Sequence, residues 1–139
     1  MRSMDEEIRR VLEMAKVIAV VGLSPNPSRP SHDVASYLKK HGYRIIPVNP
    51  HAAEILGERS YPDLREVPEP VDIVNIFRRP EFVPSIVESA IAIGAKAIWM
   101  QLGIVHEEAA ARAREAGILV VMDRCIKVEH QKYLRSLSP

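Results

Sequence analysis

Two short polar segments carry the groups best suited to hold an anionic ligand. The first follows Gly22 and contains Ser24 and Arg29, and the second contains Arg78 and Arg79. A guanidinium group is permanently charged and binds phosphate through two parallel hydrogen bonds, while a glycine lets the backbone approach a ligand closely. The two segments therefore predict a site for a ligand with several phosphates. The alternative is that the three arginines are ordinary solvated surface residues.

Each polar segment directly follows a largely apolar run. Residues 17–21 are five apolar residues that lead into Gly22, and residues 71–77 form a second run interrupted by Asp72 and Asn75. Short runs rich in valine and isoleucine are typical of strands in a parallel sheet that is covered on both faces. Helical patterns alternate with such strands along the chain. This alternation predicts an α/β fold, a Rossmann-like doubly wound parallel sheet of five to six strands with helices on both faces.

The same patterns set the expected bounds of each element. Helices are expected at residues 4–15, 31–41, 53–56, around 86–93, at 106–116 and from the end of the last strand to about 137; strands are expected at 17–21, 43–48, near 60–61, 71–77, 97–100 and 118–122. Ser3 and Glu6 form a capping box at the first helix. We expect the 17–21 strand to lie between the 43–48 and 71–77 strands. Ligands bind in this fold class where the strand order reverses, so the two polar segments would face one crevice.

Charge and hydrophobicity argue against a nucleic-acid-binding protein and against a membrane protein. Lysine and arginine number 19 against 18 aspartates and glutamates, a net charge of +1, so no global field attracts nucleic acid or an anionic membrane. No apolar run reaches the roughly 18 residues that a membrane span needs. These features predict a cytoplasmic protein. The length of 139 residues predicts a single domain over residues 1–139.

Motifs for the commonest nucleotides are absent. Gly22 is not followed by the further glycines of the dinucleotide fingerprint, and Asn49 and Pro50 stand where an acidic residue would hold the ribose of NAD. No P-loop sequence of glycine, lysine and serine or threonine occurs. The sequence also shows no readable pair of carboxylates for acid–base catalysis and no cluster of metal ligands. We therefore expect no clear catalytic machinery and no metal.

Five segments in order resemble the small bacterial and archaeal CoA-binding proteins. The single Rossmann-like domain of that family is similar to the CoA-binding domain of the succinyl-CoA synthetase α subunit. The resemblance covers nearly the whole chain, from about Ile8 to Tyr133. It rests on residues 19–24 with the loop after them, 47–50 (Pro-Val-Asn-Pro), 71–80, 99–103 (Trp-Met-Gln-Leu-Gly) and 121–126 (Val-Met-Asp-Arg-Cys-Ile).

The resemblance implies that the ligand is coenzyme A or an acyl-CoA. It implies that Gly22, Ser24 and Arg29 cradle the phosphates, and that Asn49 and Pro50 flank the adenosine end. The opposite wall and the path of the pantetheine arm would then be formed by the other candidate site residues: Phe77, Arg78, Arg79, Gln101, Gly103, Met122, Arg124 and Cys125. Reasoning from the residues alone reaches the phosphates, and only the resemblance supplies the name coenzyme A.

Cys125 is the single cysteine, which excludes an internal disulfide. If the thiol of the pantetheine arm ends nearby, Cys125 is placed to form a mixed disulfide with it, with Arg124 beside it. The alternative is that Cys125 packs as a small hydrophobic side chain.

Three functions stay open on the sequence. The first is a CoA-binding module without catalysis, which would serve as a carrier, a sensor or the partner of an acyl-CoA enzyme. The second is an enzyme, either a small NAD(P)-dependent oxidoreductase or an acyl-CoA synthetase-like subunit. The third is a redox protein that uses Cys125. A homodimer is a further candidate assembly.

Overall fold

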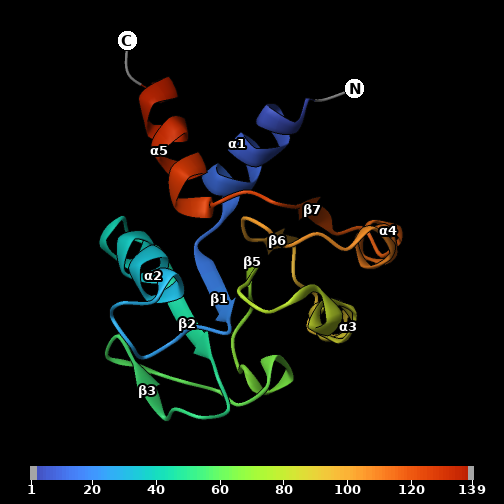
Figure 1. The fold of residues 1–139 in the computed structure, drawn as a ribbon. Helices are drawn as coiled ribbons and strands as arrows, with labels where there is room; N and C mark the ends of the chain where they lie inside the picture. The colour runs from blue at the N-terminus through green and yellow to red at the C-terminus, as the bar shows by residue number, and fades with distance from the viewer. Residues whose placement is uncertain (1–2, 138–139) are drawn as a thin grey trace.

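The structure is a computed structural model that describes residues 3–137 (Figure 1). It is built on a five-stranded parallel sheet in the order β2-β1-β5-β6-β7. The strands are β1 (Val17–Val21), β2 (Arg44–Val48), β5 (Ile73–Ile76), β6 (Ala97–Met100) and β7 (Leu119–Val121). The predicted place of β1, between β2 and β5, is confirmed. The Rossmann-like α/β fold class is confirmed with it.

Helices cover both faces of this sheet, as predicted. They are α1 (Met4–Met14), α2 (Pro30–Lys40), α3 (Val83–Ala92), α4 (Glu107–Glu115) and α5 (Ile126–Leu137). Side chains of α1, α2 and α5 share one hydrophobic core with the sheet, and side chains of α3 and α4 share the other. Figure 1 shows α3 and α4 on the opposite side of the sheet from α2 and α5.

The strand β1 is buried on both faces because its side chains alternate between the two cores. Ile18 and Val20 pack with the first group of helices, while Ala19 and Val21 pack on the other side. All four are at most 6 % exposed. A strand with one wet face would alternate apolar and polar residues. The continuous apolar run of residues 17–21 therefore correctly predicted a strand that is covered on both faces.

An aspartate from the segment before β5 holds the start of β1. The Asp72 carboxylate accepts hydrogen bonds from the backbone N–H groups of Lys16 at 2.8 Å and Val17 at 2.9 Å, and it pairs with Lys96 at 3.2 Å. Burial raises the pKa of Asp72, but the two N–H groups and the ammonium outweigh it, so the pKa lies below its ordinary 3.8. The charged carboxylate thus fixes the pairing of β1 with β5.

The helix expected at residues 53–56 is wrong. This segment forms a small antiparallel hairpin of β3 (Glu54–Ile55) and β4 (Glu58–Arg59). Leu56 and Gly57 connect the two strands, and both have positive φ angles, +55° and +74°. Two consecutive residues with positive φ are the signature of a tight hairpin turn. Residues of an α-helix have negative φ angles, so the positive φ angles of Leu56 and Gly57 exclude a helix here.

Smaller features follow the chain. Tyr61 makes a parallel bridge to Val48 near the predicted position of a short edge strand. A 3₁₀ turn, η1 (Leu64–Glu66), precedes β5, and another, η2 (Pro80–Phe82), leads into α3. At α1, Ser3 Oγ accepts a hydrogen bond from Glu6 N at 3.2 Å, as the capping motif predicts. Among residues 3–137, no helix has the length and apolar character of a membrane span.

Candidate functional site

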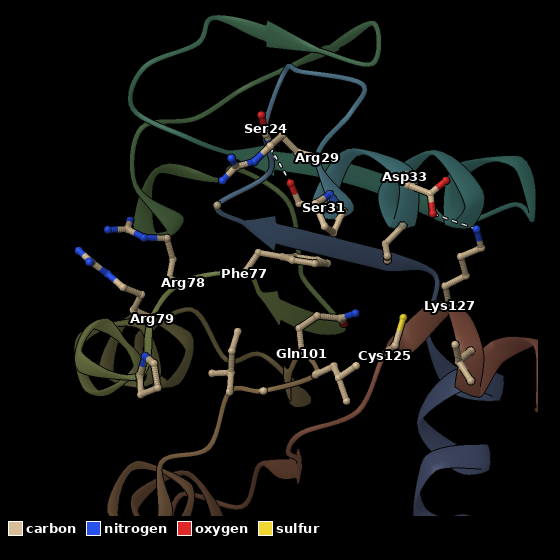
Figure 2. A pocket seen from close by; sticks show the side chains of 18 residues that line it. Ser24, Arg29, Ser31, Asp33, Phe77, Arg78, Arg79, Gln101, Cys125 and Lys127 are labelled. Carbon is tan, nitrogen blue, oxygen red and sulfur yellow. Dashed lines mark hydrogen bonds and ion pairs between the residues drawn. The ribbon is translucent and has the colours of Figure 1, made fainter.

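A crevice of about 790 Å³ lies at the edge of the sheet where the parallel strands end (Figure 2). The chain leaves β1 toward β2 on one side and returns to β5 on the other, so the loops after β1 and β5 diverge and leave space between them. The N-terminal ends of α2 and α5 form part of the walls. The residues that line the crevice are Gly22, Ser24, Arg29, Pro30, Ser31, Asp33, Val34, Phe77, Arg78, Arg79, Pro80, Gln101, Leu102, Gly103, Ile104, Cys125, Lys127 and Val128.

Gly22 forms the floor of the crevice because the loops after β1 and β5 touch there. Its N–H donates to Val48 O at 3.0 Å, and its φ angle is +90°. A Cβ atom at this position would lie 2.5 Å from the Phe77 carbonyl oxygen. No side chain fits in that space, so the first of the predicted site residues is fixed by backbone geometry.

The loop after Gly22 is braced by its own side chains. Ser24 Oγ accepts from Asn26 N at 3.1 Å, and Asn26 Oδ1 accepts from both the backbone and the hydroxyl of Ser28. Ser31, which is buried at the start of α2, accepts from Ser24 N at 3.0 Å. These hydroxyl groups hold the loop shape, and the loop carries Arg29 to the mouth of the crevice.

Two arginines flank the mouth without a carboxylate partner in residues 3–137. Neither Arg29 nor Arg78 forms an ion pair in that range, and the Arg78 guanidinium lies over the Phe82 ring at 4.2 Å. Arg79 differs because it pairs with Glu81 at 3.1 Å, with both side chains mostly exposed. Figure 2 shows Arg29 on one wall and Arg78 and Arg79 on the opposite wall. The mouth therefore concentrates positive charge.

The inner end of the crevice is lined by Gln101 and Cys125. Gln101 follows β6 and is 6 % exposed. Its Oε1 accepts from Asn75 Nδ2 at 3.3 Å and from Ile126 N at 3.2 Å. Cys125 is half-buried and immediately precedes α5. Figure 2 shows its sulfur directed into the space between Gln101 and α2.

A lysine that sequence reasoning missed closes the far side of the crevice. Lys127 Nζ lies 2.9 Å from Asp33 Oδ2, which joins the first turns of α5 and α2. Among the described residues that line the crevice, Asp33 is the only one with a carboxylate group. The signal was present in the sequence, because Lys127 stands just after the loop that follows the last strand. Its pairing with Asp33 connects positions 94 residues apart and could not be read locally.

An aromatic cluster next to Lys127 also joins α2 and α5. Tyr37 OH lies 2.8 Å from His130 Nδ1, and the His41 ring stacks near Tyr37. Burial raises the pKa of Tyr37, although Lys127 opposes the rise. Burial and, to a lesser degree, His41 lower the pKa of His130. Both side chains are therefore uncharged at neutral pH, and the tyrosine can donate its hydrogen to the imidazole.

Nine of the thirteen predicted site residues line the crevice, and four do not. The nine are Gly22, Ser24, Arg29, Phe77, Arg78, Arg79, Gln101, Gly103 and Cys125. Among the other four, Pro50 lines a separate cavity of about 160 Å³ that it shares with Arg78. Met122 packs, partly buried, against the core that contains α3 and α4.

Asn49 and Arg124 make contacts within the protein instead. Asn49 Nδ2 donates to Leu23 O at 2.9 Å, and its Oδ1 accepts from a backbone N–H at 2.8 Å. Asn49 thus fixes the end of β2 to the loop after β1. The Arg124 guanidinium pairs with Glu129 at 3.2 Å and with Asp5 at 3.7 Å. Arg124 is therefore engaged between α1 and α5, outside the crevice lining.

Comparisons with known proteins match this chain over most of its length. A family model described as "CoA binding domain" matches residues 16–131. The uncharacterized protein YneT of Bacillus subtilis is 47% identical over 124 residues, which are 89% of this chain and 92% of that protein. A solved structure of a hypothetical protein from Pyrococcus horikoshii OT3 has a TM-score of 0.91 at 40% identity, over 96% of this chain and 97% of that one.

A more distant relative is the ADP-forming acetate–CoA ligase II of Archaeoglobus fulgidus. It is 33% identical over 89 residues, which are 63% of this chain and 13% of the ligase. The region matched by the family model includes β1, the crevice loops and the first turns of α5. The chain belongs to the CoA-binding domain family.

Proposed function

We propose that this chain binds coenzyme A or an acyl-CoA in the crevice, with the phosphates held between Arg29 and Arg78. The observation that carries the proposal is the placement of these two arginines. They lack carboxylate partners within residues 3–137 and stand on opposite walls of the mouth. Phosphate oxygens would supply the acceptors that such guanidinium groups lack. The start of α2 adds the positive end of a helix dipole to the wall that carries Arg29.

The pantetheine arm would run inward from the mouth to Gln101 and Cys125. The ends of β1, β5 and β6 lie side by side along this path. A volume of about 790 Å³ is in the range of pockets that enclose cofactors and small ligands. Apolar side chains such as Val34, Leu102 and Ile104 also line the crevice and suit the methyl and methylene groups of the arm.

A dinucleotide such as NAD fits the end of β2 less well. The residue there is Asn49, and both polar groups of its side chain are engaged by the protein. A ribose diol is ordinarily held by a carboxylate at this position. The absence of that carboxylate supports coenzyme A over NAD. The NAD(P)-dependent oxidoreductase stays the alternative that the titration below decides.

The relation to the acetate–CoA ligase supports a partner role in acyl-CoA chemistry. The lining residues offer no evident acid–base pair, since the Asp33 carboxylate is occupied by Lys127. We therefore favour a binding module that serves an acyl-CoA enzyme over a chain that performs the reaction itself. A homodimer is a compatible assembly.

Calorimetric titration of the chain with CoA, acetyl-CoA, NAD and NADP tests the proposal. We expect binding of CoA and of its thioester, and none of NAD. Arg29→Ala should weaken CoA binding by at least about tenfold, because a hydrogen bond to a charged group contributes about 1.5–3 kcal/mol. Arg114→Ala is the matched control, because Arg114 is an exposed arginine on α4, away from the crevice.

Two results would contradict the proposal. Binding of NADP in place of CoA would assign the arginines to a 2′-phosphate. Equal affinity of Arg29→Ala and Arg114→Ala for CoA would remove Arg29 from the phosphate site.

A further inference from the structure

The inner end of the crevice contains an amide group with a hydrogen to donate and no acceptor for it. Gln101 is 6 % exposed, and its Oε1 accepts two hydrogen bonds from the protein. The orientation of the amide is fixed, because the backbone N–H of Ile126 is a donor and must face the oxygen. Within residues 3–137 the Nε2 group has no hydrogen-bond partner. This N–H group is accessible from the crevice and is free to donate to an acceptor on a bound ligand.

The Cys125 thiol lies beside this amide. Cys125 and Gln101 line the same end of the crevice, and Figure 2 shows the Gln101 nitrogen directed toward the side where the Cys125 sulfur lies. The loop that carries the cysteine is tied to the end of β6, since Arg124 N donates to Met100 O at 3.4 Å and Ile126 N donates to Gln101. Its place is therefore fixed by backbone hydrogen bonds.

The distance from the mouth suits a pantetheine arm. From β1 to β6 the sheet crosses two strand spacings, about 10 Å. An extended pantetheine arm of roughly a dozen bonds spans about 15 Å at ordinary bond lengths. An arm of this length that starts at the end of β1 can span to the end of β6, which Gln101 follows. Its last amide carbonyl lies a few bonds from the thiol and is an acceptor for Gln101.

We infer that Cys125 is a thiol-exchange site that captures coenzyme A from its disulfide, with Gln101 holding the amide carbonyl next to the reacting sulfur. This inference rests on the proposed function. The Cys125 sulfur, having lost its proton, attacks one sulfur of a CoA disulfide, and the bond between the two CoA sulfurs breaks. A disulfide between Cys125 and one CoA forms. The other CoA leaves as a thiolate and takes up a proton, so no further oxidant is needed.

With this exchange, CoA can be held in two ways, non-covalently or through a disulfide to Cys125. Under reducing conditions CoA would bind reversibly through its phosphates and arm. When CoA disulfide accumulates, the ligand would stay attached until a small thiol reverses the exchange. Gln101 acts here as a positioning residue, because it orients the arm and does not itself react.

The test compares two disulfides on the intact chain. The reduced protein is mixed with CoA disulfide or, at the same concentration, with glutathione disulfide, and the adduct is followed by mass spectrometry. Because Cys125 is the single cysteine, any mixed disulfide reports on this residue, and Cys125→Ser should form none. We expect CoA disulfide to react at least about tenfold faster, since binding concentrates it in the crevice. Desulfo-CoA should slow that reaction by occupying the site.

Two variants separate positioning from general reactivity. Gln101→Glu keeps the acceptors for Asn75 and Ile126 but loses the N–H donor, so the reaction with CoA disulfide should slow by about tenfold. Because the new carboxylate also disfavours the Cys125 thiolate toward any disulfide, the readout is the ratio of the two rates, and the preference for CoA disulfide over glutathione disulfide should fall by about tenfold. Arg29→Ala, at the exposed mouth, should show the same selective slowing and covers the case in which Gln101→Glu does not fold.

The outcomes distinguish this inference from the proposed function. Equal rates with the two disulfides, together with normal titration of Cys125→Ser by CoA, would overturn the exchange site and leave CoA binding intact. Failure of both the wild-type chain and Cys125→Ser to bind CoA would overturn both.

Discussion

Replacing Gly22 with alanine tests whether the close approach of β1 and β5 builds the crevice floor. A Cβ atom at residue 22 would lie 2.5 Å from the Phe77 carbonyl oxygen and 3.0 Å from Arg78 Cδ. The carbonyl belongs to the backbone just after β5 and cannot rotate away. The φ angle of +90° adds a second conflict, because alanine adopts it only with strain.

The two conflicts give the expected loss of stability. A left-handed backbone conformation costs a non-glycine residue about 1–2 kcal/mol. An extra carbon forced into a packed site costs about 1–3 kcal/mol more. We therefore expect Gly22→Ala to lower the free energy of unfolding by about 2–5 kcal/mol. At about 3–4 °C per kcal/mol for a domain of this size, Tm should fall by about 6–20 °C.

Gly42→Ala is the matched control. Gly42 has nearly the same φ angle, +94°, but no atom lies within 4 Å of the position of its missing Cβ. This variant should therefore lose only the conformational part, about 1–2 kcal/mol. Urea and thermal unfolding of both variants, followed by circular dichroism, measure the difference. Equal losses would refute the argument that Phe77 and Gly22 are in contact at the site.

Two further predictions concern the supports of the site. Asp72→Asn should cost about 1–3 kcal/mol at pH 7, because a charged acceptor for two backbone N–H groups is lost. The pKa of Asp72 lies below its ordinary 3.8 in the folded chain, so its charged carboxylate stabilises the fold above that pH, and this stabilisation is lost as the pH falls through the folded pKa. The urea midpoint of the wild-type chain should therefore decrease more steeply than that of the variant as the pH is lowered from 7 to 2. Parallel curves would contradict this. Asn49→Asp should cost about 1–3 kcal/mol in urea unfolding, because a carboxylate would face Leu23 O without a hydrogen to donate; an unchanged midpoint would show that this contact is not needed.

The strands of the sheet could be predicted because one sequence feature determines them. Residues 17–21 and 97–100 are apolar without interruption, and the structure buries all of them except the partly buried Val17. The bounds of β1 and β6 match the expectation fully. Burial on both faces also follows from the fold class, so local pattern and global topology gave the same answer.

The segment after β2 could not be predicted in the same way. A leucine with positive φ is unusual, and nothing in the residues around Leu56 requires it. The hairpin depends on contacts made elsewhere, since Lys39 on α2 pairs with Glu58 at 3.0 Å and Arg44 on β2 pairs with the same carboxylate at 2.8 Å. Short polar segments of this kind take their shape from such partners, and local propensity is a weak guide to them.

The arginines show why the candidate site was only partly readable. Arg29, Arg78, Arg79 and Arg124 all stand close after a strand, so the sequence assigned each of them to the ligand. The difference lies in whether each arginine meets a carboxylate. Arg79 pairs with a residue two positions away, and Arg124 pairs with Glu129 on α5 and with Asp5 on α1. A guanidinium group already paired gains less from a phosphate, because it must first give up its partner. Arg29 and Arg78 should therefore contribute most to binding and Arg124 least.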